Sequence, residues 1–173
     1  MPVTTISQLR NLIRTLNYVV STHAAEELED DNLTILDLEN IILSGQITER
    51  QRDLQTRESK VLVSGITLDV NRPKRSSKSV SLANSSSSQS MSSENLCAHC
   101  GSASLQVKNV TRSFGKALSL LVIEAIPMFV CADCGESYFS ASTLHEIERI
   151  KALRKSVAVA RPVPVASFRL VAG

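Results

Sequence analysis

The four cysteines are the residues of this chain whose spacing most clearly indicates chemistry. They form two pairs, each followed directly by glycine: Cys97-x-x-Cys100 and Cys131-x-x-Cys134. Two thiolates about one turn apart, next to a glycine that lets the backbone turn, are typical of a zinc knuckle. Two knuckles together supply the four sulfurs of a closed tetrahedral site. Such a site leaves no position for water, so we expect one structural Zn²⁺ held by all four cysteines.

The same spacing allows two alternatives, which are two short-range disulfides or a redox dithiol of the thioredoxin kind. The redox dithiol would need a βαβ context, which neither pair has, and it leaves the second pair unexplained. Close cysteine pairs in a cytosolic chain favour metal over disulfides. His99, inside the first knuckle, could replace a cysteine ligand, although we expect it to be exposed. We expect His145 to be solvated or packed on a helix.

Composition allows a folded core but gives no direct sign of nucleic-acid binding. The chain has 173 residues, enough for one ordinary domain or two small ones, and 43% of them are apolar while 3% are aromatic. The net charge of +2 is small, but it is unevenly spread. Residues 1–70 carry an acidic excess and residues 71–173 a basic one, which suits two modules. No apolar run reaches membrane-spanning length and no signal peptide is evident, so we expect a cytoplasmic protein.

Local patterns divide residues 1–70 into alternating helices and strands. Helical periodicity predicts three helices, and β-branched or alternating runs predict strands: 4–17, 22–31 and 35–45 for the helices, 18–21, 46–55 and 60–70 for the strands. Thr34 followed by Asp37 predicts a capping box, and Gly45 a helix end. We therefore expect an α+β domain with a small antiparallel sheet of its own.

Residues 71–96 separate this domain from the cysteines. They hold eleven serines and four basic residues, with almost nothing to bury, so we expect a disordered linker. Met91, within it, looks like the start of a second protein fused to the first. Residues 97–155 should form a zinc-knuckle β-hairpin plus helix, and residues 156–173 an extended tail. The expected elements of this second module are strands over 104–114 and 116–126, an extension over 127–131 and a helix over 140–155.

The cysteine segment resembles a known family. "LCAHCGS" and "VIEAIPMFVCADCGESYFSASTLHEIERI" resemble the YgiT-type zinc finger, the N-terminal domain of MqsA-type antitoxins, over residues 95–155. The shared features are the CxxCG knuckles, an "IE-x-(I/V)-P-x-x-V-C" strand, and "CGE-x-Y-F" before a helix. The resemblance implies that the four cysteines bind a structural zinc and that the domain packs against a ribonuclease toxin. MqsA-type antitoxins add a helix-turn-helix for DNA; none is predicted here, so DNA binding is not expected.

The first domain resembles a second family more weakly. "YVVSTHAAEELEDDNLTILDLENIILSGQITER" is similar to a bacterial family of unknown function that is often encoded beside these zinc fingers and suspected of being the toxin partner. Later strands of that family, with a "G-x-P-(I/L)-H-V-V" segment, are replaced here by serines, so we expect a truncated domain. The shared pattern falls on a short set of positions: Ser21, His23, Ala24, Gly45, Ile47 and Glu49.

A ribonuclease in the first domain would need side chains that orient the 2′-hydroxyl and stabilise the phosphorane charge. The available set is scattered along the chain: His23, Arg50, Arg52, Arg57 and Lys60. The alternative is that His23 caps a helix and that the basic side chains coat an exposed strand. The acidic excess of this domain suits RNA poorly and favours that alternative.

Taken together, these patterns predict a zinc-binding, antitoxin-like protein of a bacterial type II toxin–antitoxin system, fused to a toxin-like domain. It would neutralise a ribonuclease toxin by protein–protein binding, and the partner would be a separate toxin or the first domain of the same chain. The alternatives are an autoinhibited endoribonuclease of the RelE or MqsR kind, and a zinc ribbon that binds nucleic acid through Lys151, Arg154 and Lys155. The sheet edge around residues 118–130 and the tail are expected to add to the partner's sheet, with the equal alternative that the tail folds back and closes this edge itself.

Overall fold

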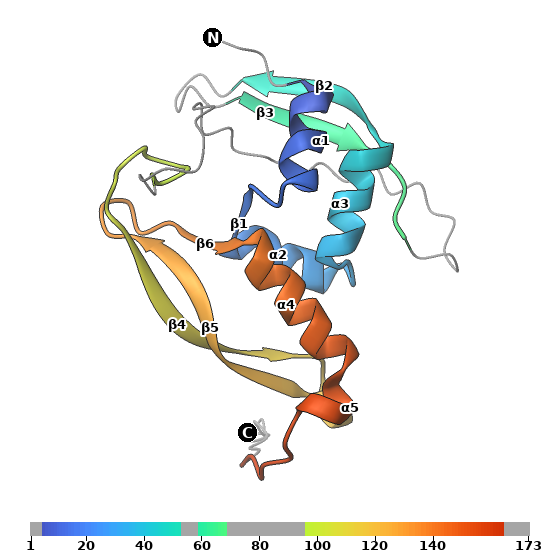
Figure 1. Cartoon of the computed structure of the whole chain (residues 1–173), viewed down its shortest axis with the longest axis vertical. Helices are drawn as coiled ribbons and strands as arrows, with labels where there is room; N and C mark the ends of the chain where they lie inside the picture. Colours follow the sequence, from blue (N-terminus) through green and yellow to red (C-terminus); the bar gives the residue numbers. More distant parts are fainter. Residues whose placement is uncertain (1–4, 53–58, 69–95, 165–173) are drawn as a thin grey trace, which may run out of the picture.

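The computed structural model describes residues 5–52, 59–68 and 96–164 (Figure 1). Most of the expected linker and the candidate Arg57 lie outside these residues. The α+β class is confirmed. The helices are α1 (Ile6–Arg14), α2 (Thr22–Asp30), α3 (Ile35–Ser44), α4 (Ala141–Ala152) and α5 (Arg154–Val157), with a 3₁₀ turn η1 (Ala117–Ser119). The strands are β1 (Val19–Ser21), β2 (Gln46–Arg52), β3 (Ser59–Ser64), β4 (Leu105–Phe114), β5 (Leu121–Cys131) and β6 (Ser137–Ser140).

The capping box expected at the start of α3 is present and does more than begin a helix. The Thr34 hydroxyl accepts from the Asp37 amide, and the Asp37 carboxylate accepts from the Thr34 amide at 2.9 Å. The same carboxylate accepts from the Leu68 amide at 2.8 Å, so it also holds the segment that follows β3. Burial raises the pKa of Asp37, but these hydrogen bonds to its ionised form outweigh burial and lower the pKa overall.

The β4–β5 hairpin is long and contains one irregularity. The sequence pattern places Leu121, Ile123 and Ala125 on one face, and the first two are buried. Ala125 is exposed instead, because it adopts a positive φ of 56° at a β-bulge between the two strands. The bulge returns Ile126, 3% exposed, to the buried face. The first residues of the expected strand 116–126 form η1 rather than strand.

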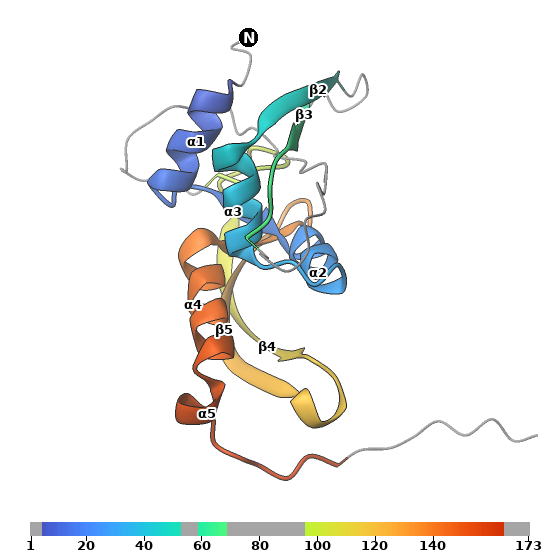
Figure 2. The same cartoon turned by 90° about the vertical axis from the view of Figure 1, so that its right-hand side faces the viewer.

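One sheet joins the two halves of the chain. Its strand order is β1-β6-β5-β4, so β1 pairs with β6 from beyond the cysteines rather than with β2 and β3. The latter form a separate two-stranded sheet. In Figures 1 and 2 the β2–β3 pair lies with α1 and α3 at one end of the molecule, the β4–β5 hairpin with α4 lies at the other, and β1, β6 and α2 lie between them. The sheet expected within residues 1–70 is thus divided between two sheets.

The main hydrophobic core also crosses the two regions that the sequence separates. We name these the N-terminal region (residues 5–68) and the cysteine region (residues 96–157). Phe139 of β6, 1% exposed, lies opposite Val20 of β1, 7% exposed. Each region contributes further buried side chains to the same cluster: Leu9, Ile13, Ile35, Leu38, Ile41, Ile42, Val61 and Val63 from the first, and Phe114, Leu121, Ile123, Ile126, Leu144 and Ile147 from the second.

Beyond α5 the described chain continues without helix or strand to residue 164. Arg161 donates from Nη1 to both carboxylate oxygens of Glu124 on β5, at 3.1 and 3.2 Å. The start of the tail therefore lies against its own hairpin. Within residues 5–52, 59–68 and 96–164, no helix is long and apolar enough to cross a membrane.

Candidate metal centre

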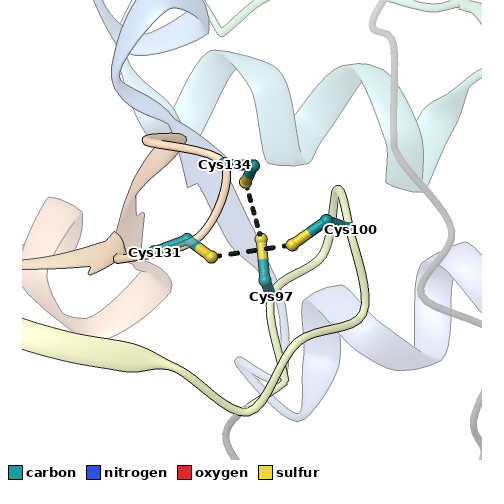
Figure 3. A group of neighbouring side chains, drawn as sticks. All are labelled: Cys97, Cys100, Cys131 and Cys134. Atoms are coloured by element: carbon teal, nitrogen blue, oxygen red, sulfur yellow. Dashed lines mark hydrogen bonds between the residues drawn. The ribbon is translucent and has the colours of Figure 1, made fainter.

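The four cysteine sulfurs converge at one point between the two knuckles (Figure 3). All four lie within 4.8 Å of one another. Cys97 Sγ is 3.6 Å from Cys134 Sγ, and Cys100 Sγ is 3.6 Å from Cys131 Sγ. A tetrahedral zinc with Zn–S bonds of about 2.3 Å requires sulfur–sulfur separations of about 3.8 Å. The donor set therefore fits a tetrahedral metal ion, as the sequence predicts.

Both knuckles have the same backbone geometry, which glycine makes possible. The Gly101 amide donates to the Cys97 carbonyl at 2.9 Å, and the Gly135 amide donates to the Cys131 carbonyl at 3.0 Å. The two glycines have φ values of 75° and 77°, in the left-handed region that residues with a Cβ rarely adopt. The glycine after each cysteine pair is therefore needed for the turn that aims the two sulfurs the same way.

Direct hydrogen bonds also connect one knuckle to the other. The Ala132 amide donates to the Ser104 carbonyl at 3.0 Å, and the Ser102 hydroxyl donates to the Asp133 carboxylate. The hydrogen bond from Ser102 lowers the pKa of Asp133. These two hydrogen bonds help to bring the knuckles face to face around the four sulfurs.

The thiols have unequal environments. Cys97 and Cys131 are buried, whereas Cys100 and Cys134 are exposed. Burial raises the pKa of Cys97, but hydrogen bonds from the Cys100 amide, the Tyr138 hydroxyl and the His99 amide outweigh it and lower the pKa to about 6. The Glu136 amide favours the thiolate of Cys134, but desolvation and the neighbouring cysteines outweigh it and raise the pKa to about 12. The Ser102 amide and Cys134 lower the pKa of Cys100, but desolvation and the sulfurs of Cys131 and Cys97 outweigh them and raise it. Cys97 is thus favoured as a thiolate, whereas Cys100 and Cys134 need a cation to compensate the charge of their thiolates.

Tyr138 is a residue of this site that we did not single out from the sequence. Its ring is buried, 6% exposed, and its hydroxyl lies 3.5 Å from Cys97 Sγ. Both burial and the adjacent sulfur raise the pKa of Tyr138, so it stays a neutral donor to the thiolate. Groups that hydrogen-bond to a metal ligand orient it and tune its basicity. The "CGE-x-Y-F" motif contains this tyrosine, and that motif is the signal that could have identified it.

We expect metal binding to weaken steeply as the pH falls. Cys100 and Cys134 have raised pKa values, so binding as thiolates must release at least their two protons near pH 7. Acid returns those protons, and the apparent zinc affinity should fall by at least about a hundredfold per pH unit. Competition with a chromophoric chelator at pH 6, 7 and 8, at constant ionic strength, measures this slope. An affinity that does not change with pH would show that the thiols are not the ligands.

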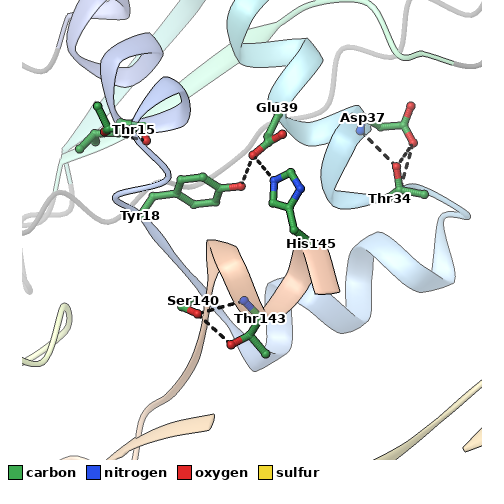
Figure 4. Close-up of polar contacts among 9 residues, drawn as sticks. Thr15, Tyr18, Thr34, Asp37, Glu39, Ser140, Thr143 and His145 are labelled. Atoms are coloured by element: carbon green, nitrogen blue, oxygen red, sulfur yellow. Dashed lines mark hydrogen bonds and ion pairs between the residues drawn. The ribbon is translucent and has the colours of Figure 1, made fainter. Parts of the chain in front are cut away.

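Among the described residues, the group that could hold a metal contains no histidine. His99 is exposed, as expected, and is not part of the four-residue cluster. His145 Nε2 lies 2.8 Å from Glu39 Oε1, and the Tyr18 hydroxyl donates to the same oxygen at 2.6 Å (Figure 4). Burial and the hydrogen bond to Glu39 raise the pKa of Tyr18. This three-residue polar contact joins α4 to the N-terminal region, which helical periodicity alone could not indicate.

The candidate ribonuclease residues that the structure describes lie on three elements. His23 is on α2, its side chain 80% exposed and 3.3 Å from Glu27 Oε1 on the same helix. Arg50 and Arg52 lie on β2 and Lys60 on β3, opposite Gln51. Figures 1 and 2 draw α2 apart from the β2–β3 pair. His23 thus lies on a different element from the described basic residues of this set, and a catalytic role for the set stays a prediction.

Comparison with known proteins identifies one similarity. Residues 20–73 match the model of a family described as a domain of unknown function, DUF4258. The match covers the N-terminal region from β1 onward and does not extend to the cysteines, so the zinc-finger resemblance stays a prediction. Comparisons with curated proteins and with solved structures give no significant match.

Proposed function

We propose that the cysteine region is a zinc-stabilised, antitoxin-like protein-binding module of a bacterial type II toxin–antitoxin system. Its ligand in this chain is the toxin-like N-terminal region. The observation that carries this proposal is the pairing of β1 with β6, by which a strand from one region extends the sheet of the other. Strand addition of this kind is a general way for one protein segment to bind another.

The metal in this proposal has a structural role. Four cysteines fill a tetrahedral coordination shell, so no open position remains for a water or a substrate. Zinc suits a site with four thiolate donors. When bound, it would fix the two knuckles and the strands that leave them, while the chain's own side chains make the contacts with the partner.

Polar contacts around the strand pairing give it specificity. The Thr22 and Ser137 hydroxyl oxygens lie 2.8 Å apart, and Arg112 Nη2 donates to Glu26 Oε1 at 2.7 Å. Each pair joins a residue of α2 in the N-terminal region to a strand of the cysteine region. Together with the contact between Glu39 and His145, they would favour this ligand over an unrelated strand.

A nucleic-acid-binding zinc ribbon receives less support. Lys151 Nζ lies 2.8 Å from Glu148 Oε1 and 5.4 Å from the centre of the Phe114 ring. Arg154 donates to the Ser119 carbonyl at 3.1 Å. These two basic side chains therefore have partners within the cysteine region, and binding phosphates would require them to leave those partners.

The proposal is tested by cutting the chain between the two regions while the folded protein is intact. A protease site is inserted between residues 79 and 90, and the zinc-loaded chain is cleaved and passed over a size-exclusion column. We expect the fragments to elute together, because the module binds its ligand without a covalent link. Separation of the fragments at micromolar concentration would contradict antitoxin-like binding. RNA cleavage by the separated N-terminal fragment, lost with His23→Ala, would identify that fragment as the ribonuclease.

A further inference from the structure

The geometry of the cysteine centre points to a switch, and we propose that metal occupancy controls the docking of the N-terminal region. With metal bound, β6 presents the edge that β1 pairs with; without it, β1 and α2 are released. This inference rests on the proposed binding of the N-terminal region by the cysteine region, and it adds the regulation of that contact.

The second knuckle directly positions β6. Cys131 is the last residue of β5, and β6 begins at Ser137, so the knuckle is the whole connection between them. The pairing of β5 with β6 is short and consists of Phe129 opposite Tyr138 and Val130 opposite Ser137. A strand held by so little pairing depends on the turn that precedes it, and that turn carries two of the four metal ligands.

The first knuckle contacts β6 through Tyr138. The tyrosine hydroxyl lies 3.5 Å from Cys97 Sγ, and the tyrosine backbone lies opposite Ser21 of β1. Cys97 and Tyr138 are both buried in a small cluster of their own around the sulfurs. Movement of Cys97 after metal loss would therefore disturb the residue that β1 pairs with.

β6 in turn positions α4, which makes the other main contact with the N-terminal region. Ser140 ends the strand and caps α4 by accepting from the Thr143 amide at 3.1 Å. The helix carries His145, whose Nε2 lies 2.8 Å from Glu39 Oε1 (Figure 4). The Ala141 amide at its start donates to the Tyr18 carbonyl at 3.2 Å. The pairing of β1 with β6 and the contact between His145 and Glu39 thus both depend on β6, the strand that follows the second knuckle.

Coupling of this kind is reciprocal, which makes it measurable from either side. If metal strengthens docking by some factor, docking strengthens metal binding by the same factor, and couplings between sites are typically about 5–150-fold. A metal that holds the knuckles together without affecting the contact between the two regions would give a coupling factor of one.

Hydrogen exchange of the full chain tests the first direction. The zinc-loaded protein is compared with protein stripped by a chelator under reducing conditions. We expect the amides of β1 and that of Ala141 to exchange at least about tenfold faster without zinc. The amides of β3, with the buried Val61 and Val63, serve as the internal control and should change little.

Zinc affinity of interface variants tests the second direction. His145→Ala removes the contact to Glu39 without touching a cysteine, and we expect it to lower zinc affinity by about fivefold or more. His23→Ala is the matched control, because the His23 side chain is 80% exposed and its ion pair is with Glu27 of the same helix. It should leave the affinity unchanged. Equal affinities for the two variants would overturn the coupling.

The hydrogen-exchange results distinguish failure of the metal switch from failure of the proposed binding between the two regions. Protection of β1 that is equal with and without zinc overturns the switch and leaves the binding proposal standing. Absence of protection in both states contradicts the binding proposal as well. Loss of protection along the whole chain, β3 included, overturns the switch, because the metal would then fold the protein rather than control one contact.

Discussion

Replacement of Cys131 by alanine is expected to abolish zinc binding and to free the two knuckles and β6 from the arrangement that the metal holds. Cys131 is 1% exposed and supplies one of four converging sulfurs. Three remaining thiols cannot complete the tetrahedral shell, and metal binding in small zinc-folded peptides contributes about 10–16 kcal/mol to folding. The purified variant should contain well under one zinc per chain, measured by elemental analysis. The amides of β6 and β1 should lose their protection from hydrogen exchange.

His99→Ala is the matched control for this result. His99 lies between Cys97 and Cys100 in the first knuckle but is exposed and outside the cluster. The variant should retain one zinc per chain. If Cys131→Ala keeps its zinc while His99→Ala loses it, the ligand set contains the histidine, and the four-cysteine centre is wrong.

Truncation of Phe139 to alanine should have the second largest effect. Its side chain is 1% exposed and lies on β6, opposite Val20 of the N-terminal region. Loss of a buried phenylalanine costs about 3–5 kcal/mol, from lost burial and from the cavity left behind. Urea denaturation of the zinc-loaded chain, followed by circular dichroism, measures this loss. Because Phe139 lies between the regions, protection should fall in β1 and α2 as well as in β5.

Val107→Ala is the control for that experiment. Val107 is on β4 of the same sheet but is 61% exposed, and exposed substitutions usually change the free energy of unfolding by less than about 0.5 kcal/mol. A Phe139→Ala variant that loses no more stability than Val107→Ala would show that the two regions do not share a core in solution.

The sequence by itself determined the local elements and the four candidate metal ligands. The CxxCG pairs indicated the four sulfurs, because the knuckle is a local turn whose geometry depends on neighbouring residues. Thr34 and Asp37 indicated the start of α3 for the same reason: a capping box closes within one helical turn. Helices and strands were predictable to within a few residues wherever periodicity was strong, and the α+β class followed from them.

Only the tertiary structure decided how the two regions meet. β1 is three residues long, and its apolar pattern suits any sheet edge, so nothing in it indicated β6 as its partner. The contact between Glu39 and His145 joins residues 106 positions apart, and the role of Tyr138 depends on a sulfur 41 positions away. The bulge at Ala125 likewise shifts the buried face in a way that alternation cannot reveal. Periodicity reports which face of an element is buried, but which element covers that face depends on packing between segments distant in the chain.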